Sequence, residues 1–439
     1  MSNTTKTKRI HFRGVICAAS FAFPLCAFAN NAFYLTGYGS ESVMMGGADV
    51  AVARDSFATV NNAAGMTRIK GQTAELETAL FANPEGSHTD SFGNYRKPFY
   101  NSVGVYASAA YAKRFENTPF SAGAGLVVQG GLGWAFAGLN VNPALGGGRD
   151  DASAAFTVIR FSPAIAWKVN DQWSLGAGLG VNYFSGNQEL FPNTSAGSSA
   201  SFPQGFAGIR FKGASGIGLN SKWGLQYHPT DDVTVGLTYG TQTSIPLKDG
   251  VLRINFSDPA FGSLGVVRYD NAKLTGLRLP EELALGVSFR PTLRLLVSLQ
   301  DKWYNWSDAI NKLQITATNP RTPGAPSIVT IPSTLDFSDQ HVIEIGFAYD
   351  YSKDTTLTFG INHGSRPIPD QNVSAVFQPI QARHYMYGAK QKFDDGWFAA
   401  GVVEWFALQS VTYDSAVFGP RANEHHQGVV FHISVGRTW

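Results

Sequence analysis

Residues 172–183, QWSLGAGLGVNY, alternate between two kinds of side chain. Trp, Leu, Ala, Leu, Val and Tyr take the odd positions, and small or polar residues take the even positions. Because successive side chains of a β-strand point to opposite faces, this stretch predicts a strand with one apolar face and one small, polar face. The same alternation recurs at residues 232–239, 293–300 and 343–351.

The connections between these segments indicate what kind of sheet they form, since a soluble β-sandwich would alternate in the same way. Short polar turns fall at residues 169–171, 228–231, 290–292, 352–354 and 393–396. Long links fall between them, at residues 129–153, 184–205, 246–265, 305–339, 365–382 and 410–425. Short turns at one end and long loops at the other are typical of outer-membrane barrels. We therefore expect an all-β fold, a closed antiparallel transmembrane barrel of about fourteen strands.

Composition and the aromatic residues agree with a barrel. Only 15% of the 439 residues are charged, while 47 are Gly and 31 are Phe. Aromatic rings favour the level of the lipid head groups, and six of them flank expected strand ends, at Trp167, Trp173, Trp223, Tyr227, Trp303 and Trp405. Residues 429–439 alternate again and finish at Trp439, like the aromatic terminal strand of bacterial outer-membrane proteins. The expected location is the bacterial outer membrane.

The first 29 residues have the pattern of a cleaved secretory signal. Four basic residues precede an apolar run that ends in Ala27-Phe28-Ala29, an A-x-A cleavage pattern. Both cysteines, Cys17 and Cys26, lie inside this stretch, so the mature chain would have no disulfide. Removing the four basic residues leaves 30 Lys and Arg against 32 Asp and Glu, a net charge of about −2. This balance does not favour a nucleic-acid partner.

Residues 30–72 do not read as part of a barrel wall. Glycines interrupt them, and their apolar residues follow no single period. The apolar content is too high for a disordered tail, and a barrel of this size has an interior wider than its own side chains fill. We therefore expect residues 30–72 to form a plug, or hatch, in the lumen of a barrel made by residues 73–439.

Three blocks of sequence resemble the FadL-type outer-membrane transporters of long-chain fatty acids and other hydrophobic compounds. They are GADVAVARDSFATVNNAAGMTRIKG at residues 47–71, LPEELALGVSFRPTLRLLVSLQDKWYNWSDAINKLQI from Leu279, and RPIPDQNVSAVFQPIQARHYMYGAKQKF from Arg366. The family hatch carries Asn-Pro-Ala-Gly where this chain has Asn62-Ala63-Ala64-Gly65, and the family usually ends in Phe where this chain has Trp439.

The resemblance implies a hatch-sealed barrel of fourteen strands, a hydrophobic groove among the outer loops, a deeper pocket, and lateral exit through a gap made by a kinked strand. Each candidate set has a simpler structural alternative. Trp134, Phe136 and Leu139 are expected to form the outer groove or to pack their loop onto the barrel mouth, with Phe191 and Phe202 as partners. Phe33, Leu35 and Phe57 would line the pocket or form the core of the plug.

The charged and glycine candidates also have a simpler structural alternative each. Arg54 and Arg68 would meet a substrate carboxylate or pair with Glu344 or Asp350 of the wall. Gly123 and Gly125 are candidates for the strand kink or are ordinary strand glycines. The expected ligand is a long-chain fatty acid or an aromatic hydrocarbon. The other expected partners are outer-membrane lipid, lipopolysaccharide and the barrel-assembly machinery, and the protein is expected to be a monomer.

Other functions remain open at this point. The chain after residue 29 has no G-x-S-x-G, H-E-x-x-H, P-loop or C-x-x-C motif. His425 and His426 point to opposite strand faces and cannot chelate as one site, whereas His432 faces the lumen by parity. No enzyme activity, metal or cofactor is expected. A general diffusion porin, an outer-membrane barrel lipase and a structural barrel or adhesin are the alternatives.

Overall fold

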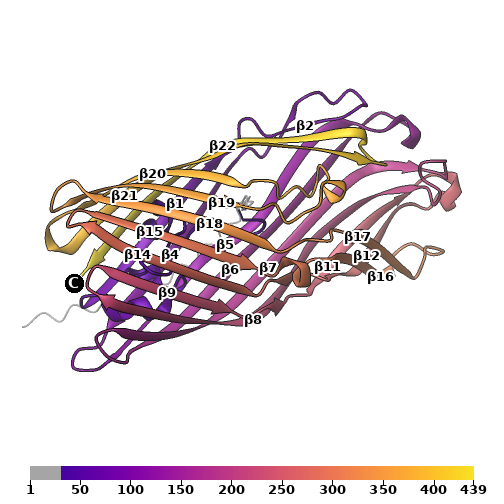
Figure 1. Cartoon of the computed structure of the whole chain (residues 1–439). Coiled ribbons are helices and arrows are strands. Elements are labelled where there is room, and N and C mark those ends of the chain that lie inside the picture. The colour runs from indigo at the N-terminus through magenta and orange to yellow at the C-terminus, as the bar shows by residue number, and fades with distance from the viewer. Residues whose placement is uncertain (1–30) are drawn as a thin grey trace, which may run out of the picture.

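The computed structural model describes residues 31–439, so the expected signal peptide lies outside the described residues. The chain forms a tall barrel (Figure 1). Its wall consists of fourteen strands: β1 (Gln72–Ala82), β4 (Val103–Arg114), β5 (Phe120–Asn140), β6 (Arg149–Lys168), β7 (Trp173–Ala196), β8 (Phe206–Thr230), β9 (Val233–Gly240), β14 (Glu282–Thr292), β15 (Leu295–Tyr304), β18 (Gln340–Asp350), β19 (Thr355–Gly364), β20 (Arg383–Lys392), β21 (Trp397–Ser415) and β22 (Gly419–Thr438).

Each wall strand pairs antiparallel with the next, and the last strand closes the barrel on the first. The closing pair runs from Thr73 opposite Thr438 to Ala82 opposite Val429. A closed sheet leaves no unpaired edge in the membrane, where unsatisfied backbone groups are costly. The prediction of a fourteen-stranded antiparallel barrel is confirmed. Among the described residues, no helix is long and apolar enough to cross a membrane.

The two faces of the wall have the polarity of a membrane barrel. In β7, Trp173 and Leu179 are 38% and 46% exposed on the outside, whereas Ser174 and Asn182 are buried in the lumen. A soluble sandwich would place the apolar face inside and the polar face outside. In this chain the arrangement is reversed, which shows that the apolar, odd-numbered side chains of residues 172–183 face lipid.

The strands extend much farther beyond the outer side than the sequence predicted. The expected long link at residues 129–153 contains the upper half of β5, and the link at 184–205 contains the upper part of β7. The connections between β9 and β14, between β15 and β18, and between β19 and β20 hold short elements: β10 (Thr243–Ser244), β11 (Leu247–Phe256), η4 (Pro259–Phe261), β12 (Gly265–Thr275), β13 (Arg278–Leu279), α2 (Trp306–Ala309), β16 (Lys312–Pro320), β17 (Ile328–Thr334) and η5 (Asp370–Asn372). The other short elements outside the barrel wall are β2 (Ser87–Thr89), β3 (Lys97–Pro98), η3 (Pro143–Leu145) and η6 (Asp394–Gly396).

An additional sheet extends the wall at the extracellular end. The lower half of β8 pairs with β9, but its upper half, from Ile209 to Ser215, pairs with β11. From β11 the sheet continues through β12 and β16 to β17. Figure 1 places β16 and β17 at the end of the barrel opposite the C-terminus and the short turns.

Residues 31–71, called here the N-terminal segment, lie inside the barrel, with their helices at the end near the C-terminus (Figure 1). Residues 31–35 lie farther up the lumen, where Tyr34 is bridged to Gly130 in the middle of β5. The segment contains α1 (Ser40–Met44), η1 (Ser56–Thr59) and η2 (Ala63–Arg68). Lumen-facing glycines let it approach the wall closely, since a Cβ added at Gly236 would lie 2.2 Å from the carbonyl oxygen of Val50. The small even-numbered residues of the strands thus leave room for this segment.

Candidate functional site

The barrel wall is broken between β4 and β5. These strands pair only from Arg114 opposite Ser121 to Ala109 opposite Leu126. Above that point β5 stays with β6, with a register shift between Val128 and Gly130, while residues 103–108 of β4 have no partner on β5. The edge of β5 above Leu126 is therefore open to another chain segment, because each strand edge carries unpaired amides and carbonyls.

The N-terminal segment occupies this edge. The amide of Leu35 donates to the carbonyl of Gln129 at 3.2 Å, and the amide of Gly131 donates to the carbonyl of Phe33 at 2.9 Å. The Tyr38 hydroxyl also donates to the Gln129 carbonyl, at 2.8 Å. A Cβ at Gly130 would lie 1.7 Å from the Phe33 oxygen, so this contact needs glycine.

The two glycines expected at the strand kink lie below the break. Gly123 and Gly125 sit in regular pairs with β4, and a Cβ at either would meet Thr59 or Val60 of the N-terminal segment. Both glycines therefore allow close packing of η1 on the wall. Whether they also bend β5 stays a prediction, because the irregular pairing begins at Val128.

An aromatic cluster fills the lumen above the break, with Phe33 at its centre. The Phe33 ring lies 6.5 Å from Phe156, 6.3 Å from Phe184, 6.0 Å from Trp306 and 5.8 Å from Phe377. These rings come from β6, β7, α2 and the segment after η5. Leu35 is buried in the same cluster, whereas Phe57 lies in a separate one with Val60, Ala110 and Val127.

The expected outer-loop groove is not a surface loop. Trp134, Phe136 and Leu139 belong to strand β5, and all three are fully buried. Residues 127–136 are buried on both faces, so this stretch has no apolar and polar alternation and looked like a loop in the sequence. Farther out, Phe191 lies 5.7 Å from Phe418, and Phe202 lies 6.0 Å from Phe206.

The two arginines of the N-terminal segment lie at the periplasmic end, away from the aromatic cluster. Arg54 pairs with Glu41 at 2.9 Å, and Arg68 donates to the carbonyl of Asp171 at 3.0 Å. Their expected wall partners have other cations: Lys302 lies 3.3 Å from Glu344, and Arg290 lies 3.7 Å from Asp350. Neither arginine forms an ion pair with Glu344 or Asp350 among residues 31–439, although the charge of Arg54 still interacts with that of Asp350.

Polar lumen residues that were not singled out in the sequence hold the N-terminal segment in place. The Gln300 side chain accepts from the Val50 amide at 2.8 Å and donates to the Gly47 carbonyl at 3.1 Å. Glu77 accepts from the Gly39 amide at 3.0 Å, and its other oxygen lies 3.0 Å from Nδ1 of His432. The prediction that the His432 side chain faces the lumen is thereby confirmed. The signal available in the sequence was the presence of polar residues at the lumen-facing positions of the strands.

Asn62 and Gly65 of the hatch motif have separate structural roles. The Asn62 side chain caps η2 by accepting from the Ala64 amide, and it donates to the carbonyls of Val50 at 2.8 Å and Leu225 at 3.1 Å. It therefore links η2 to the wall strand β8. A Cβ at Gly65 would lie 1.6 Å from the Ala53 carbonyl, so the chain can cross there only with glycine.

A buried cation faces the lumen below the aromatic cluster. Arg160 of β6 is 2% exposed and lies opposite Asn182, two residues along β7 from Phe184. Its Nε and Nη2 atoms have no hydrogen-bond partner within residues 31–439. Arg160 interacts electrostatically with Tyr34, the residue bridged to Gly130 at the break. The charge of Arg160 also interacts with the buried carboxylate of Glu282, so Arg160 has an acidic neighbour although these two groups make no hydrogen bond. Because buried guanidinium groups normally use their N–H groups, the two that remain are available to a further acceptor.

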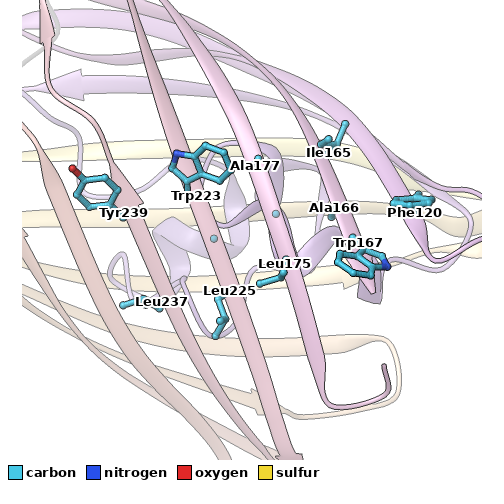
Figure 2. Close-up of a pocket in the computed structure, with 12 residues that line it drawn as sticks. Phe120, Ile165, Ala166, Trp167, Leu175, Ala177, Trp223, Leu225, Leu237 and Tyr239 are labelled. Atoms are coloured by element: carbon cyan, nitrogen blue, oxygen red, sulfur yellow. The ribbon is translucent and has the colours of Figure 1, made fainter. Parts of the chain in front are cut away.

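One further hollow lies on the membrane-facing surface and not in the lumen. It encloses about 360 Å³ over β5 to β9, between Trp167, Leu175, Trp223 and Leu237. Figure 2 shows these side chains spread over the strands with the N-terminal helices behind the wall. Its floor includes Gly176 and Gly224, where the wall is thin. This hollow is lined by outward-facing side chains of the wall, so it is separate from the aromatic cluster in the lumen.

Comparisons with known proteins agree with this geometry. Residues 15–395 match the family model described as outer membrane protein transport protein (OMPP1/FadL/TodX). The chain belongs to this family of outer-membrane transporters of hydrophobic compounds. Comparison with curated protein sequences gave no match. Within residues 31–439, no group of three His, Cys, Asp or Glu residues is arranged to hold a metal ion.

Solved structures share the fold at low sequence identity. The Pseudomonas putida toluene transporter TodX is 19% identical with a TM-score of 0.74, and the alignment covers 92% of this chain and 99% of TodX. The Ralstonia pickettii toluene transporter TbuX is 18% identical with a TM-score of 0.72 over the same shares. A Pseudomonas aeruginosa FadL homologue is 16% identical, with a TM-score of 0.69 over 93% of this chain and 99% of that one.

Proposed function

We propose that this protein takes up long-chain fatty acids, or similar amphiphiles with a carboxylate, by passive lateral transfer. In this proposal residues 30–72 act as the hatch. The aromatic cluster around Phe33 is the deeper pocket, and the break between β4 and β5 is the exit. The observation that carries the proposal is that Phe33 and Leu35 bond directly to the open edge of β5. Movement of these few residues would open the pocket to the membrane.

The driving force for such uptake is the burial of apolar surface. Each CH₂ group moved from water into an apolar site gains about 0.8 kcal/mol. The rings around Phe33 offer such a site, and the membrane beyond the break offers another of similar polarity. Net transfer then follows the concentration gradient and needs no energy source. A water-filled porin pore would provide no such gain, which is why the aromatic cluster disfavours the porin alternative.

The presence of Arg160 in the lumen favours a substrate that carries a carboxylate. The free N–H groups of Arg160 lie below the aromatic rings of Phe156 and Phe184. A fatty acid could place its chain among the rings and its carboxylate on the guanidinium, with charge-assisted hydrogen bonds that are stronger than neutral ones. Aromatic hydrocarbons are the second candidate. The ring-lined cluster favours them, and the similar structures include toluene transporters.

A binding titration distinguishes the two substrate classes. Mature protein refolded in detergent is titrated with oleate and with an alkylbenzene, and displacement of a bound fluorescent lipid is measured. We expect oleate to bind, and Arg160→Gln to weaken oleate at least tenfold without changing the alkylbenzene. Arg149→Gln, at an exposed position of the same strand, is the matched control. If Arg160→Gln has no effect and the alkylbenzene binds tightly, the substrate is a hydrocarbon.

Ion conductance tests the porin alternative. In a planar bilayer we expect no steady current from the wild type, because the N-terminal segment fills the lumen. Steady open-channel current together with no saturable ligand binding would contradict the transporter proposal. The monomeric state and the contact with the barrel-assembly machinery stay predictions.

A further inference from the structure

A row of arginines crosses the outer face of the extracellular sheet. The register places Glu189 of β7 opposite Arg210 of β8, Arg210 opposite Arg253 of β11, and Arg253 opposite Arg268 of β12. Three arginines are therefore direct cross-strand neighbours. Like charges on directly opposite residues destabilise a sheet, so an anion bound beside such a row would stabilise it.

The acidic residues nearby do not balance this charge. Glu189 pairs with Arg210 at 3.0 Å and with Lys212 at 2.5 Å, and Asp270 pairs with Arg268 at 2.6 Å and also with Arg321. Arg253 has no acidic partner within residues 31–439. Five cations thus face two carboxylates.

The cations surround an open hollow and remain accessible. A hollow of about 280 Å³ is lined by Arg210, Lys212, Gly213, Val251, Arg253 and Arg268. The side chains of Arg268 and Lys212 are 36% and 56% exposed. The hollow is large enough for a phosphate group, and several guanidinium groups point at the same space.

The patch lies farther out along β8 than the residues that face the membrane. On β8, the exposed apolar residues Ile217 and Leu219 mark the part of the strand that faces lipid. Arg210 is seven residues farther out, roughly 23 Å along the strand at about 3.3 Å per residue. The strand tilt of about 45° reduces this to about 16 Å of height. The inward neighbour Phe211 is fully buried, so Arg210 and Lys212 point outward, sideways along the membrane surface.

We propose that this patch, Arg210, Lys212, Arg253 and Arg268, binds the phosphate groups of a lipopolysaccharide molecule in the outer leaflet. A phosphorylated glycolipid is the anion that a protein meets at this height on the side of an outer-membrane barrel. Arg presents paired N–H donors that match phosphate oxygens. A bound phosphate would relieve the repulsion around Arg253. This site lies outside the lumen and does not depend on the proposed transport.

Thermal unfolding with added glycolipid tests the site. Protein refolded without lipopolysaccharide is heated in detergent with purified rough-type lipopolysaccharide, with the same material after enzymatic dephosphorylation, or with inorganic phosphate. We expect Tm to rise by several degrees only with the phosphorylated glycolipid. The Arg253→Gln/Arg268→Gln variant should need at least tenfold more of it for the same shift. Arg294→Gln, an exposed arginine in the turn at the periplasmic end, should behave like the wild type.

A second readout separates binding from a structural role. Without glycolipid, Arg253→Gln should be as stable as the wild type or more stable, because it removes like-charge repulsion. The proposal is overturned if the double variant responds like the wild type, or if dephosphorylated glycolipid acts equally well. An equal response to inorganic phosphate would show a general anion site and would also overturn it. Oleate binding should be unchanged in the double variant, so failure here leaves the transport proposal intact.

Discussion

The backbone amide of Leu35 donates a hydrogen bond of 3.2 Å to the carbonyl oxygen of Gln129, on the stretch of β5 that β4 has left. At this point a residue of the N-terminal segment makes the hydrogen bond to β5 that a neighbouring wall strand would otherwise make. The break in the wall and the segment that fills it are parts of one arrangement, since either alone would leave backbone groups unpaired.

Substitution of Gly130 is expected to loosen this closure. In Gly130→Ala the new Cβ would lie 1.7 Å from the Phe33 carbonyl and push the N-terminal segment off β5. We expect the Gly131 amide, which donates to that carbonyl, to exchange its hydrogen at least about tenfold faster, equivalent to about 1.4 kcal/mol. Hydrogen exchange in detergent measures this, together with uptake of a hydrophobic dye by producing cells, which should increase. Gly401→Ala, where a Cβ meets nothing within 4 Å, should change neither. Unchanged exchange in Gly130→Ala would argue against a closure at this site.

Restoring the proline of the family motif should stabilise the N-terminal segment. Ala63 is the first residue of η2, where the amide has no helical partner, so Pro fits there. Asn62 has φ −150° and ψ 102°, in the extended region that a residue before proline prefers. We expect Ala63→Pro to raise the free energy of unfolding by about 0.4 to 1 kcal/mol. Ala64→Pro is the contrasting variant, because it removes the amide that donates to the Asn62 side chain at 3.2 Å. We expect this variant to have a lower free energy of unfolding than the wild type. Equal effects at the two positions would contradict the assigned start of η2.

Stability should depend on pH through His88 in the extracellular loop. Its Nδ1 lies 2.6 Å from Glu424 and its Nε2 lies 3.1 Å from Asp90. Burial opposes the charged imidazolium, but the two carboxylates outweigh it and raise the pKa of His88 from 6.5 to about 9. The stabilisation is therefore complete below about pH 6.5 and is lost as pH rises through about 9, by at most roughly 3 kcal/mol.

Melting curves between pH 6 and pH 10 check this dependence. The wild type should lose stability across that window, and His88→Gln should flatten the profile. His425→Gln, at a half-buried neighbouring position, should keep the wild-type profile. A steep profile retained in His88→Gln would assign the titration to another group.

Because the odd-numbered apolar residues of β7 face the membrane, the stability lost on adding a charge should depend on the depth of the substituted residue in the bilayer. Leu179 lies midway along the exposed apolar row of β7, whereas Leu293 is 95% exposed in the turn between β14 and β15. Arg near the bilayer midplane of a barrel costs about 2 to 4 kcal/mol, and near the interface about 0 to 1 kcal/mol. Denaturant unfolding from lipid vesicles should give this difference between Leu179→Arg and Leu293→Arg. Equal costs would mean that Leu179 does not face the hydrocarbon core.

The sequence alone determined the barrel and the presence of a filled lumen. Alternation at residues 172–183 defines two faces of a strand, and this property needs only the local backbone geometry. The glycines and apolar residues of the N-terminal segment predicted a buried site, and the lumen of a barrel of this size offers one. The family resemblance in residues 47–71 pointed to the same segment.

Tertiary structure alone decided where the wall breaks and which charges meet. The sequence could not reveal that residues 127–136 form a strand buried on both faces, because its period disappears when both faces are covered. It could not place Arg253 between Arg210 and Arg268, because strand register is a relation between distant segments. Nor could it show that the N-terminal segment folds Arg54 back onto Glu41. The interior break, the free Arg160 and the arginine row all depend on such register. A local pattern fixes which face a residue takes, but only the closed sheet fixes its neighbours.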